Sequence, residues 1–282
     1  MKKLIYLTAA ALAAFAFTAC EKTGGNENEE TDPNFTENEG SFTYYGETYK
    51  TVTFENGSVW MAEPLRYVPE GYTVSADPAD DDAHIWYPYA INEDGTTAAL
   101  TDEASVNALG YLYDPYAAFI VSEINDDNKK SFEGIQGICP KGWHIPTKAD
   151  FFALCGYASK AEGEEADQKD ETAFLYDAAS KGSNIGIFNE AGWNYVFSGA
   201  KTGTSYSKVV IDENKCSNPD FIGKPALNYI MASTYFNTMS SGTIQYYALM
   251  STFTSAYKQG RLHLAGNNIT NGVQVRCVKD AE

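Results

Sequence analysis

Hydrophobic and polar residues alternate in short runs towards both ends of the chain. In residues 41–62 the runs are rich in Thr and aromatic residues, and turn signals at 45–47 (YGE) and 56–58 (NGS) separate them. Short alternating runs between turn residues predict antiparallel strands. The pattern returns further on, where glycines punctuate the chain and the expected strands are 185–188, 193–197, 208–211, 229–232, 244–253 and 261–264.

The middle of the chain has the spacing of helices instead. Apolar side chains recur on one face over residues 103–109 and 115–124, and Phe119 and Ile120 lie on the face of the second segment. Residues 161–179 place their acidic side chains early, which suits the positive end of a helix dipole. These segments predict helices between the two strand-rich regions.

Residues 138–154 hold the densest set of turn residues, ICPKGWHIPT followed by KADFFAL. Pro146 biases the residue before it towards an extended conformation. The Thr147 hydroxyl can accept a hydrogen bond from a free backbone N–H, and Asp150 stands at the acidic position of a capping box. The chain is therefore expected to arrive extended, turn, and enter a helix over residues 147–157.

The chain ends in a further alternating run. Val273, Val275 and Cys277 alternate with Gln274 and Arg276. A period of two is typical of a strand that buries one face and exposes the other. The run therefore predicts a half-buried strand in the last residues of the chain.

Several short motifs occur in the order seen in a known family. They are 59–63 (VWMAE), 110–113 (GYLY) with 116–118 (YAA), 138–140 (ICP) with 142–147 (GWHIPT), 233–235 (STY) and 275–280 (VRCVKD). In this order they resemble the Fibrobacter succinogenes major paralogous domain family over about residues 42–280. The resemblance implies a structural role for Trp60, Trp143, His144, Pro146, Thr147 and Arg276.

The resemblance also implies a fold. The GWHIPT motif before a helix and the terminal VRCV look like the C-type-lectin-like and formylglycine-generating-enzyme fold. The expectation is an α+β domain over residues 41–282, built of short antiparallel strands with two or three helices. The family usually has asparagine after its first motif, whereas this chain has Pro64, which cannot supply that amide. Neither family name fixes an activity.

Four cysteines remain beyond the N-terminal segment, an even number that permits two bridges in an oxidising compartment. The resemblance places Cys139 and Cys277 in matched motifs and implies a bridge between them. The chain-entropy model gives such a long loop about 4–5 kcal/mol of stabilisation at most. Cys155 lies on the expected buried face of its helix, as a free core thiol or as a partner of Cys216.

The first 19 residues have the features of a signal peptide: two lysines, then a short apolar run that is too short to span a bilayer comfortably. Cys20 follows FTA, which resembles the lipobox of bacterial lipoproteins and implies a lipidated N-terminus. An ordinary signal peptide with an incidental cysteine is the alternative. Residues 20–40 are acidic, with almost nothing to bury, and predict a disordered tether.

The net charge of the chain limits the classes of molecule that it can bind. Without Lys2 and Lys3 the chain has 18 basic and 38 acidic side chains, a net charge of −20. Such a chain repels nucleic acid and anionic lipid, so nucleic-acid binding is excluded. Acidic residues after a lipidated cysteine also resemble surface-exported lipoproteins, although a plain solvated spacer has the same composition. The expected location is the outer membrane, lipid-anchored and facing outward; a periplasmic orientation stays open.

Candidate ligand residues come from two regions. Residues 66–102 are longer than the family pattern and combine acids with aromatic rings, a pairing typical of sugar-binding faces; the candidates there are Asp81, Asp82, Trp86, Tyr87 and Tyr89. The alternative is an acidic loop whose rings pack back on the body. In the C-terminal half, Tyr235 and Asn237 precede the 240–243 turn, and tyrosine suits recognition surfaces.

No catalytic or cofactor motif is present in the sequence, and no cofactor is expected. The acidic run lacks the glycine and distal glutamate of a calcium loop, so no metal is assigned. Of the three histidines, His144 is expected to brace its turn. The resulting hypothesis is a non-enzymatic binding module for glycan or protein, acting in adhesion. A structural or tip subunit of a surface appendage is the alternative, and an enzyme is the third possibility.

Overall fold

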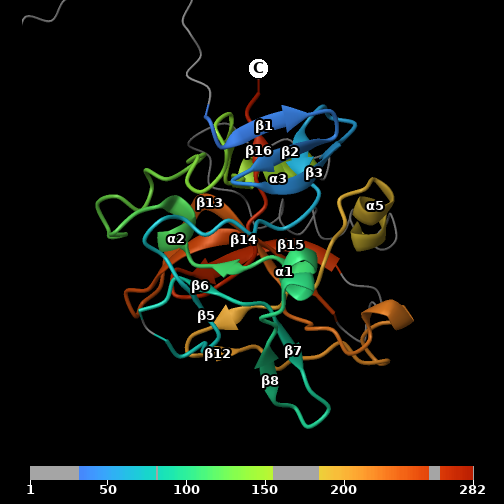
Figure 1. Ribbon diagram of the computed structural model, residues 1–282. Coiled ribbons are helices and arrows are strands. Elements are labelled where there is room, and N and C mark those ends of the chain that lie inside the picture. Colours follow the sequence, from blue (N-terminus) through green and yellow to red (C-terminus); the bar gives the residue numbers. More distant parts are fainter. Residues whose placement is uncertain (1–31, 81, 155–183, 254–260, 282) are drawn as a thin grey trace, which may run out of the picture. The chain divides into compact units, whose positions relative to one another are not determined.

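The computed structural model describes residues 32–80, 82–154, 184–253 and 261–281, which form an α+β fold dominated by antiparallel strands (Figure 1). The helices in this part of the chain are α1 (Glu103–Leu109), α2 (Pro115–Phe119), α3 (Lys148–Leu154), α5 (Asn184–Glu190) and the single 3-10 turn η1 (Pro219–Phe221). The strands are β1 (Phe35–Asn38), β2 (Ser41–Tyr44), β3 (Glu47–Thr53), β4 (Val59–Met61), β5 (Val74–Ser75), β6 (Ile85–Trp86), β7 (Tyr89–Ile91), β8 (Thr97–Ala99), β9 (Leu112–Tyr113), β10 (Trp143–His144), β11 (Lys201–Thr202), β12 (Ser205–Tyr206), β13 (Tyr229–Thr238), β14 (Ile244–Thr252), β15 (Arg261–Asn268) and β16 (Val278–Lys279).

A six-stranded sheet joins both ends of the described chain, in the order β1-β2-β3-β4-β16-β10. The hairpins expected in residues 41–62 are confirmed, and Gly46 and Gly57 take the positive φ angles that their turns require. The tether prediction is wrong at its C-terminal end, because residues 35–38 form β1 and pair with β2. The Phe35 ring packs against Phe42, so this short segment buries apolar surface that an acidic spacer lacks.

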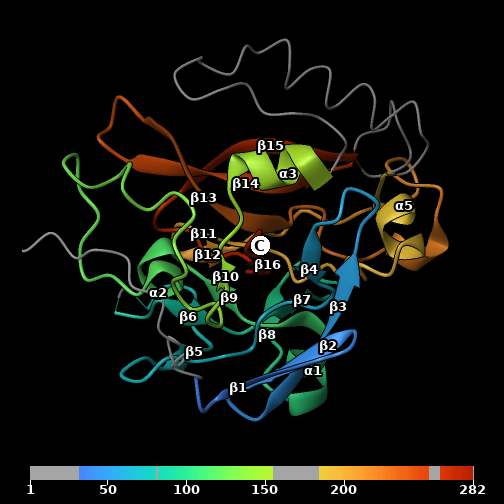
Figure 2. The ribbon, with the colours of Figure 1, turned by 90° about the horizontal axis from the view of Figure 1, so that it is seen from above.

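A second sheet consists of β13, β14 and β15, and all of its pairs are antiparallel. Helix α3 contacts β13 and β14, and Figure 2 shows it lying across this sheet. Its predicted start is confirmed, because the Asp150 N–H donates to the Thr147 hydroxyl and Thr147 donates back to the Asp150 carboxylate. The described part of the helix ends at Leu154; the expected continuation to 157 and the helix over 161–179 lie outside the described residues.

Four sequence expectations are wrong in the middle of the chain. Residues 185–188 belong to helix α5 and not to a strand, because Ile185 and Phe188 place apolar groups three residues apart on one buried side. Residues 193–197 form no strand, although Trp193, Tyr195 and Phe197 are buried, and residues 208–211 make only an isolated bridge. Helix α2 ends at Phe119, where Ile120 adopts a left-handed conformation and is exposed.

The C-terminal run at 273–277 is not a half-buried strand. It makes isolated bridges to β9 on one side and to β13 on the other, and strand pairing begins only after the run, at Val278 and Lys279 of β16. Gln274 and Arg276 are completely buried, as are the apolar residues between them. The run lies between β9 and β13, so the side chains on both of its faces are covered by protein. Neither the apolar nor the polar positions of the alternating pattern face solvent.

Arg276 links three segments from this buried position. Its guanidinium donates to the carbonyls of Ala62, Trp193 and Asn194. Burial lowers the pKa of Arg276 to about 9. Carbonyl dipoles take the place of a carboxylate partner here, which agrees with the structural role that the motif implies.

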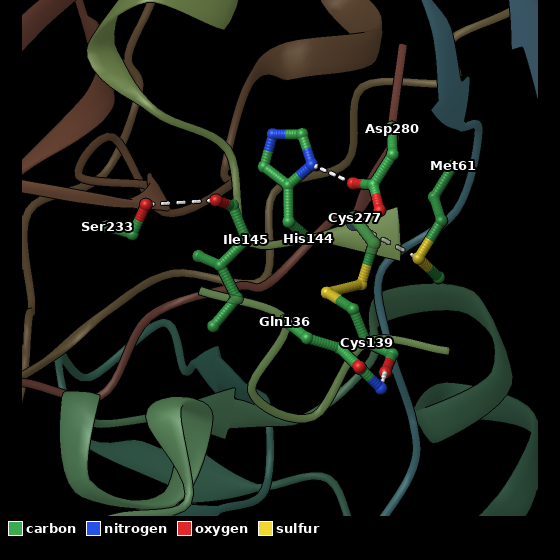
Figure 3. The surroundings of a disulfide bond; sticks show 8 residues. All are labelled: Met61, Gln136, Cys139, His144, Ile145, Ser233, Cys277 and Asp280. Carbon is green, nitrogen blue, oxygen red and sulfur yellow. Dashed lines mark hydrogen bonds and ion pairs between the residues drawn. A yellow bond between two sulfur atoms is a disulfide. The ribbon is translucent and has the colours of Figure 1, made fainter. Parts of the chain in front are cut away.

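The predicted bridge between Cys139 and Cys277 is confirmed, with the two Cα atoms 5.8 Å apart (Figure 3). It joins the turn before β10 to the residue before β16. The Cys277 N–H also donates to the Met61 sulfur of β4, so strands from both ends of the chain meet at the bridge. Cys216 is a free, buried thiol, and Cys155 lies outside the described residues.

Candidate ligand-binding site

The aromatic residues predicted as a sugar-stacking face do not form one. Trp86 and Tyr89 are each only 1% exposed, and they pack in a small core with Leu112 and Tyr206. A buried ring cannot offer its face to a ligand, so this part of the prediction is wrong. The insertion follows the alternative reading, in which its rings pack back on the body.

The other candidates of this region remain at the surface or outside the described part. Asp82 is exposed, and Tyr87 is half-buried with its ring 5.6 Å from that of Tyr111. Asp81 lies outside the described residues. The structure therefore does not bring Asp82 and the predicted rings together as one exposed face.

A pocket of about 370 Å³ opens beside the β7–β8 hairpin. Its walls come from four separate segments: the hairpin, the end of α1, the unpaired stretch after α5, and η1 with the turn that follows it. The lining residues with partly exposed apolar side chains are Ala90, Ile91, Leu100, Leu109, Val196 and Phe221. Tyr89 completes a wall, so one residue of the original prediction does line a concave site.

The polar groups of this pocket divide into two kinds. The hydroxyls of Tyr89 and Tyr195 already have internal partners: Tyr89 donates to the Ser207 carbonyl, and Tyr195 accepts from the Asn228 amide. Burial raises the pKa of both tyrosines, so neither supplies a proton near neutral pH. Asp220 and Lys224 are exposed members of the lining. The site thus offers apolar walls with a carboxylate and an ammonium group in its lining, and this chemistry suits binding.

The pocket residues were not predictable as a site. Phe221 is the last residue of the capped turn η1, in which the Asn218 side chain accepts from the Asp220 N–H. That turn could have been read from the sequence NPDF. The sequence does not indicate that this turn lies beside Ile91. The two segments are far apart in the chain, and they do not belong to the same sheet.

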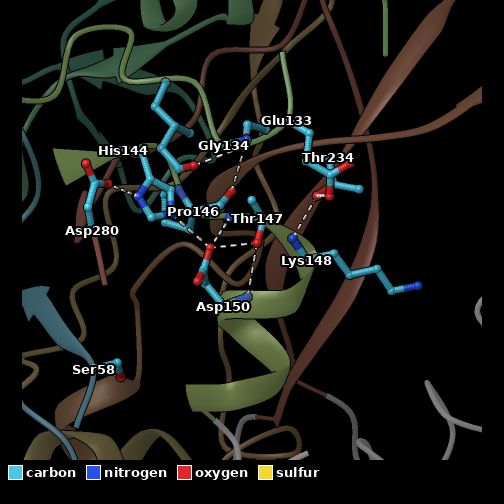
Figure 4. A network of polar contacts seen from close by, with 12 residues as sticks. Ser58, Glu133, Gly134, His144, Pro146, Thr147, Lys148, Asp150, Thr234 and Asp280 are labelled. Carbon is cyan, nitrogen blue, oxygen red and sulfur yellow. Dashed lines mark hydrogen bonds and ion pairs between the residues drawn. The ribbon is translucent and has the colours of Figure 1, made fainter. Parts of the chain in front are cut away.

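His144 braces its turn, as expected, and both of its ring nitrogens are engaged (Figure 4). Nδ1 lies 2.6 Å from an Asp280 carboxylate oxygen and Nε2 lies 3.1 Å from an Asp150 oxygen. Burial lowers the pKa of His144, but the two carboxylates outweigh it and the net shift is upward. The pKa of Asp150 falls despite burial, because His144 and Thr147 hydrogen-bond its charged form. The cluster is a structural ion network that ties β10, α3 and the C-terminal end together.

The remaining motif residues also serve the framework. The rings of Trp60 and Trp143 are buried in the core, at 0% and 1% exposure. The Pro146 carbonyl accepts from the Ser233 N–H and so holds the turn against β13. The motif as a whole therefore marks the closing of the fold and not a ligand surface.

His84 forms a second histidine–carboxylate pair that the sequence spacing did not indicate. Its Nδ1 lies 2.7 Å from the Asp114 carboxylate, whose other oxygen caps α2 by accepting from the Ala117 N–H. The hydrogen bond from the imidazole to the Asp114 carboxylate raises the pKa of His84, while burial raises the pKa of Asp114. The rings of Tyr72 and Tyr116 flank the imidazole. Asp114 before Pro115 is a visible helix-start signal, but its histidine partner comes from another segment.

Tyr235 and Asn237 lie on the same strand but have different surroundings. The half-buried Tyr235 ring packs towards Tyr246, and Lys129 lies 5.1 Å above it. Asn237 is exposed. The two residues therefore do not form one binding patch, and only Asn237 is fully available at the surface.

The family model of the Fibrobacter succinogenes major domain matches residues 55–279, and the chain belongs to this family. No curated protein and no solved structure matches the chain. Within the described ranges, no group of three or more His, Cys, Asp or Glu side chains is arranged to hold a metal ion. No helix among the same residues is long and apolar enough to cross a membrane.

Proposed function

We propose that this protein is a lipid-anchored lipoprotein of the outer membrane, facing outward, that acts in adhesion as a non-enzymatic binding module. The single observation that carries the binding role is the 370 Å³ pocket. Pockets of this size with apolar walls and a few polar groups are the usual form of ligand sites. Its tyrosines are internally bonded and its two charged groups lie exposed, which favours binding over proton transfer.

The pocket favours a ligand that presents an apolar group. Six partly exposed apolar side chains line it, and burying such surface gains about 25 cal/mol per Å². An aliphatic or aromatic side chain of a protein fits this chemistry, with Asp220 and Lys224 available to charged groups beside it. A glycan is the alternative ligand, because sugar rings also present apolar C–H faces.

A C-type-lectin-like fold is part of this proposal. Strand β4 near the start of the domain pairs with β16 at its end, so the long intervening chain is closed into a loop. The disulfide and the His144 network reinforce this closure. A separate three-stranded sheet, β13–β15, is formed within the loop.

The test uses the full chain in detergent against a peptide library and a glycan array, each repeated with chelator. Phe221→Ala is expected to weaken binding about tenfold, because it removes an aromatic wall. Ile120→Ala, an equally apolar change at an exposed position away from the pocket, is the control. Binding that Phe221→Ala leaves unchanged would contradict the pocket as the site.

A structural subunit of a surface appendage is the second candidate, and β1 is the observation that favours it. This strand is at one edge of the six-stranded sheet, and the side chains of residues 36–38 are exposed. An exposed edge can pair with a strand of another copy. Assembly that grows with protein concentration in light scattering would support this role, whereas a monomer at all concentrations would contradict it.

A further inference from the structure

Three amide side chains form a row across β13, β14 and β15. Asn237 is directly opposite Gln245, and Gln245 is directly opposite Asn268. Directly opposite residues of antiparallel strands point to the same face of the sheet. The Gln245 amide donates to the Asn268 side-chain oxygen over 2.7 Å, which confirms that these two groups share a face.

A β-bulge adds an aromatic ring to this face. Tyr235 pairs with Tyr246 and Asn237 pairs with Gln245, so Phe236 is an extra residue on β13. A bulge of this kind re-aims side chains. Tyr235 stays with the core, while the Phe236 ring meets the ring of Tyr247 edge-on at 4.8 Å.

Gly266 makes room for the ring of Phe236. A Cβ atom at this glycine would lie 2.5 Å from Phe236 Cδ1 and 3.1 Å from the Gln245 side-chain oxygen. Any other residue would therefore displace the ring from β15. The same contacts show that the ring and the Gln245 amide lie side by side on one face of the sheet.

The second ring is held in place by the first residue of α3. Lys148 donates from Nζ to the Tyr247 hydroxyl over 3.0 Å, and the ammonium group lies 4.4 Å above the ring centre. The Lys148 N–H donates to the Thr234 hydroxyl, which in turn donates to Glu133 (Figure 4). Helix α3 and β13 thus fix the Tyr247 side chain before any ligand arrives.

These five residues, Phe236, Asn237, Gln245, Tyr247 and Asn268, are termed the amide–aromatic face. Asn237 is exposed, and the other four are partly exposed. The row has spare hydrogen-bonding capacity: within the described part of the chain, the Asn237 amide, the Gln245 side-chain oxygen and the Asn268 side-chain nitrogen have no hydrogen-bond partner. An amide both donates and accepts, so a row of amides matches the vicinal hydroxyls of a sugar ring.

We propose that the amide–aromatic face binds a neutral carbohydrate chain. The rings of Phe236 and Tyr247 would contact the C–H faces of the sugar, and the amide row would hold its hydroxyls. The net charge of −18 disfavours anionic polysaccharides, and the one ammonium group at the face is already engaged by Tyr247. This site is separate from the pocket, since the two have no residue in common.

An array of neutral gluco-, xylo-, manno-, galacto- and N-acetylglucosamine oligosaccharides tests the proposal with the full chain in detergent. The oligosaccharide that the wild-type protein binds on this array is then tested with variants. Phe236→Ala and the double variant Asn237→Ala with Gln245→Ala are each expected to weaken its binding about tenfold or more. Asn107→Ala, which removes an exposed amide from α1, is the matched control and should leave binding unchanged.

Two results would overturn the proposal: silence across the whole array, or binding that the face variants do not weaken. Loss of oligosaccharide binding in Phe221→Ala alone would place the sugar in the pocket, which refutes this site but keeps the proposed function. The single variant Asn237→Ala changes the face at an exposed amide that contributes little to the core, so it is expected to fold. Near-ultraviolet circular dichroism checks that each variant is folded.

Discussion

The two histidine–carboxylate sites differ in how completely the imidazole is used. His144 engages a carboxylate at each ring nitrogen, and its side chain is 17% exposed. His84 engages Asp114 through Nδ1 alone, and its side chain is 37% exposed. A ring with both nitrogens bonded can only hold structure together, whereas a ring with one bonded nitrogen can still meet a ligand or solvent.

The two sites also differ in what surrounds them. His144 lies beside the disulfide, where β10, α3 and the C-terminal end meet (Figure 3). His84 belongs to the segment between the family motifs, where it meets Asp114 at the start of α2 and the rings of Tyr72 and Tyr116. At the site that closes the fold, both ring nitrogens of the histidine are bonded within the protein. At the site on the added segment, one ring nitrogen has no carboxylate partner. Four experiments probe this difference.

The largest effect is expected from the disulfide. Replacing Cys139 and Cys277 together by serine should lower the free energy of unfolding by about 2–5 kcal/mol, because the long loop is no longer closed in the unfolded chain. Urea unfolding of the variant and of the wild type measures the change. Asn107→Ala serves as the surface control, and a loss below about 1 kcal/mol would mean that the network alone closes the fold.

His144→Gln should cost about 1–2 kcal/mol near pH 6, because it removes two charge-assisted hydrogen bonds. The folded-state pKa of His144 is raised, so its contribution is complete below the unfolded pKa of about 6.5 and is lost as pH rises through the folded pKa. The difference between wild type and variant should therefore shrink towards pH 9. Urea midpoints at several pH values measure this, and a constant difference would refute the ion network.

His84→Gln should cost less, below about 1 kcal/mol, because solvent screens the half-exposed ring. Its contribution has the same sign with pH, since the pKa of His84 is raised as well. Unfolding under the conditions used for His144→Gln allows direct comparison. A cost equal to that of His144→Gln would show that exposure does not separate the two sites.

Asp114→Asn should change stability least and alter the histidine most specifically. Asparagine can still cap α2, but the substitution removes the carboxylate charge that raises the pKa of His84. The pKa of His84 is therefore expected to fall towards its ordinary value while that of His144 stays raised. Titration of the imidazole signals by nuclear magnetic resonance measures both, and an unchanged His84 would mean that another group sets its pKa.

The local sequence alone determined the start of α3 and the hairpins after residue 41. Thr147 with Asp150, and Gly46 and Gly57, need only their own neighbours in the chain to act. Their chemistry is complete within a few residues. The bridge between Cys139 and Cys277 was also predictable, through the family resemblance and not through spacing.

Only the tertiary structure decided which side chains meet solvent. Trp86 belongs to a segment of acids and aromatic rings that predicted a ligand site, but its side chain lies in the core. Arg276 occupies a polar position of an alternating run, where a surface residue is expected, but it is completely buried. The amide row depends on the register of three strands and on one bulge, and the pocket depends on four segments that are distant in sequence. Burial and register are set by long-range packing, and local spacing carries no information about which distant segment covers a residue.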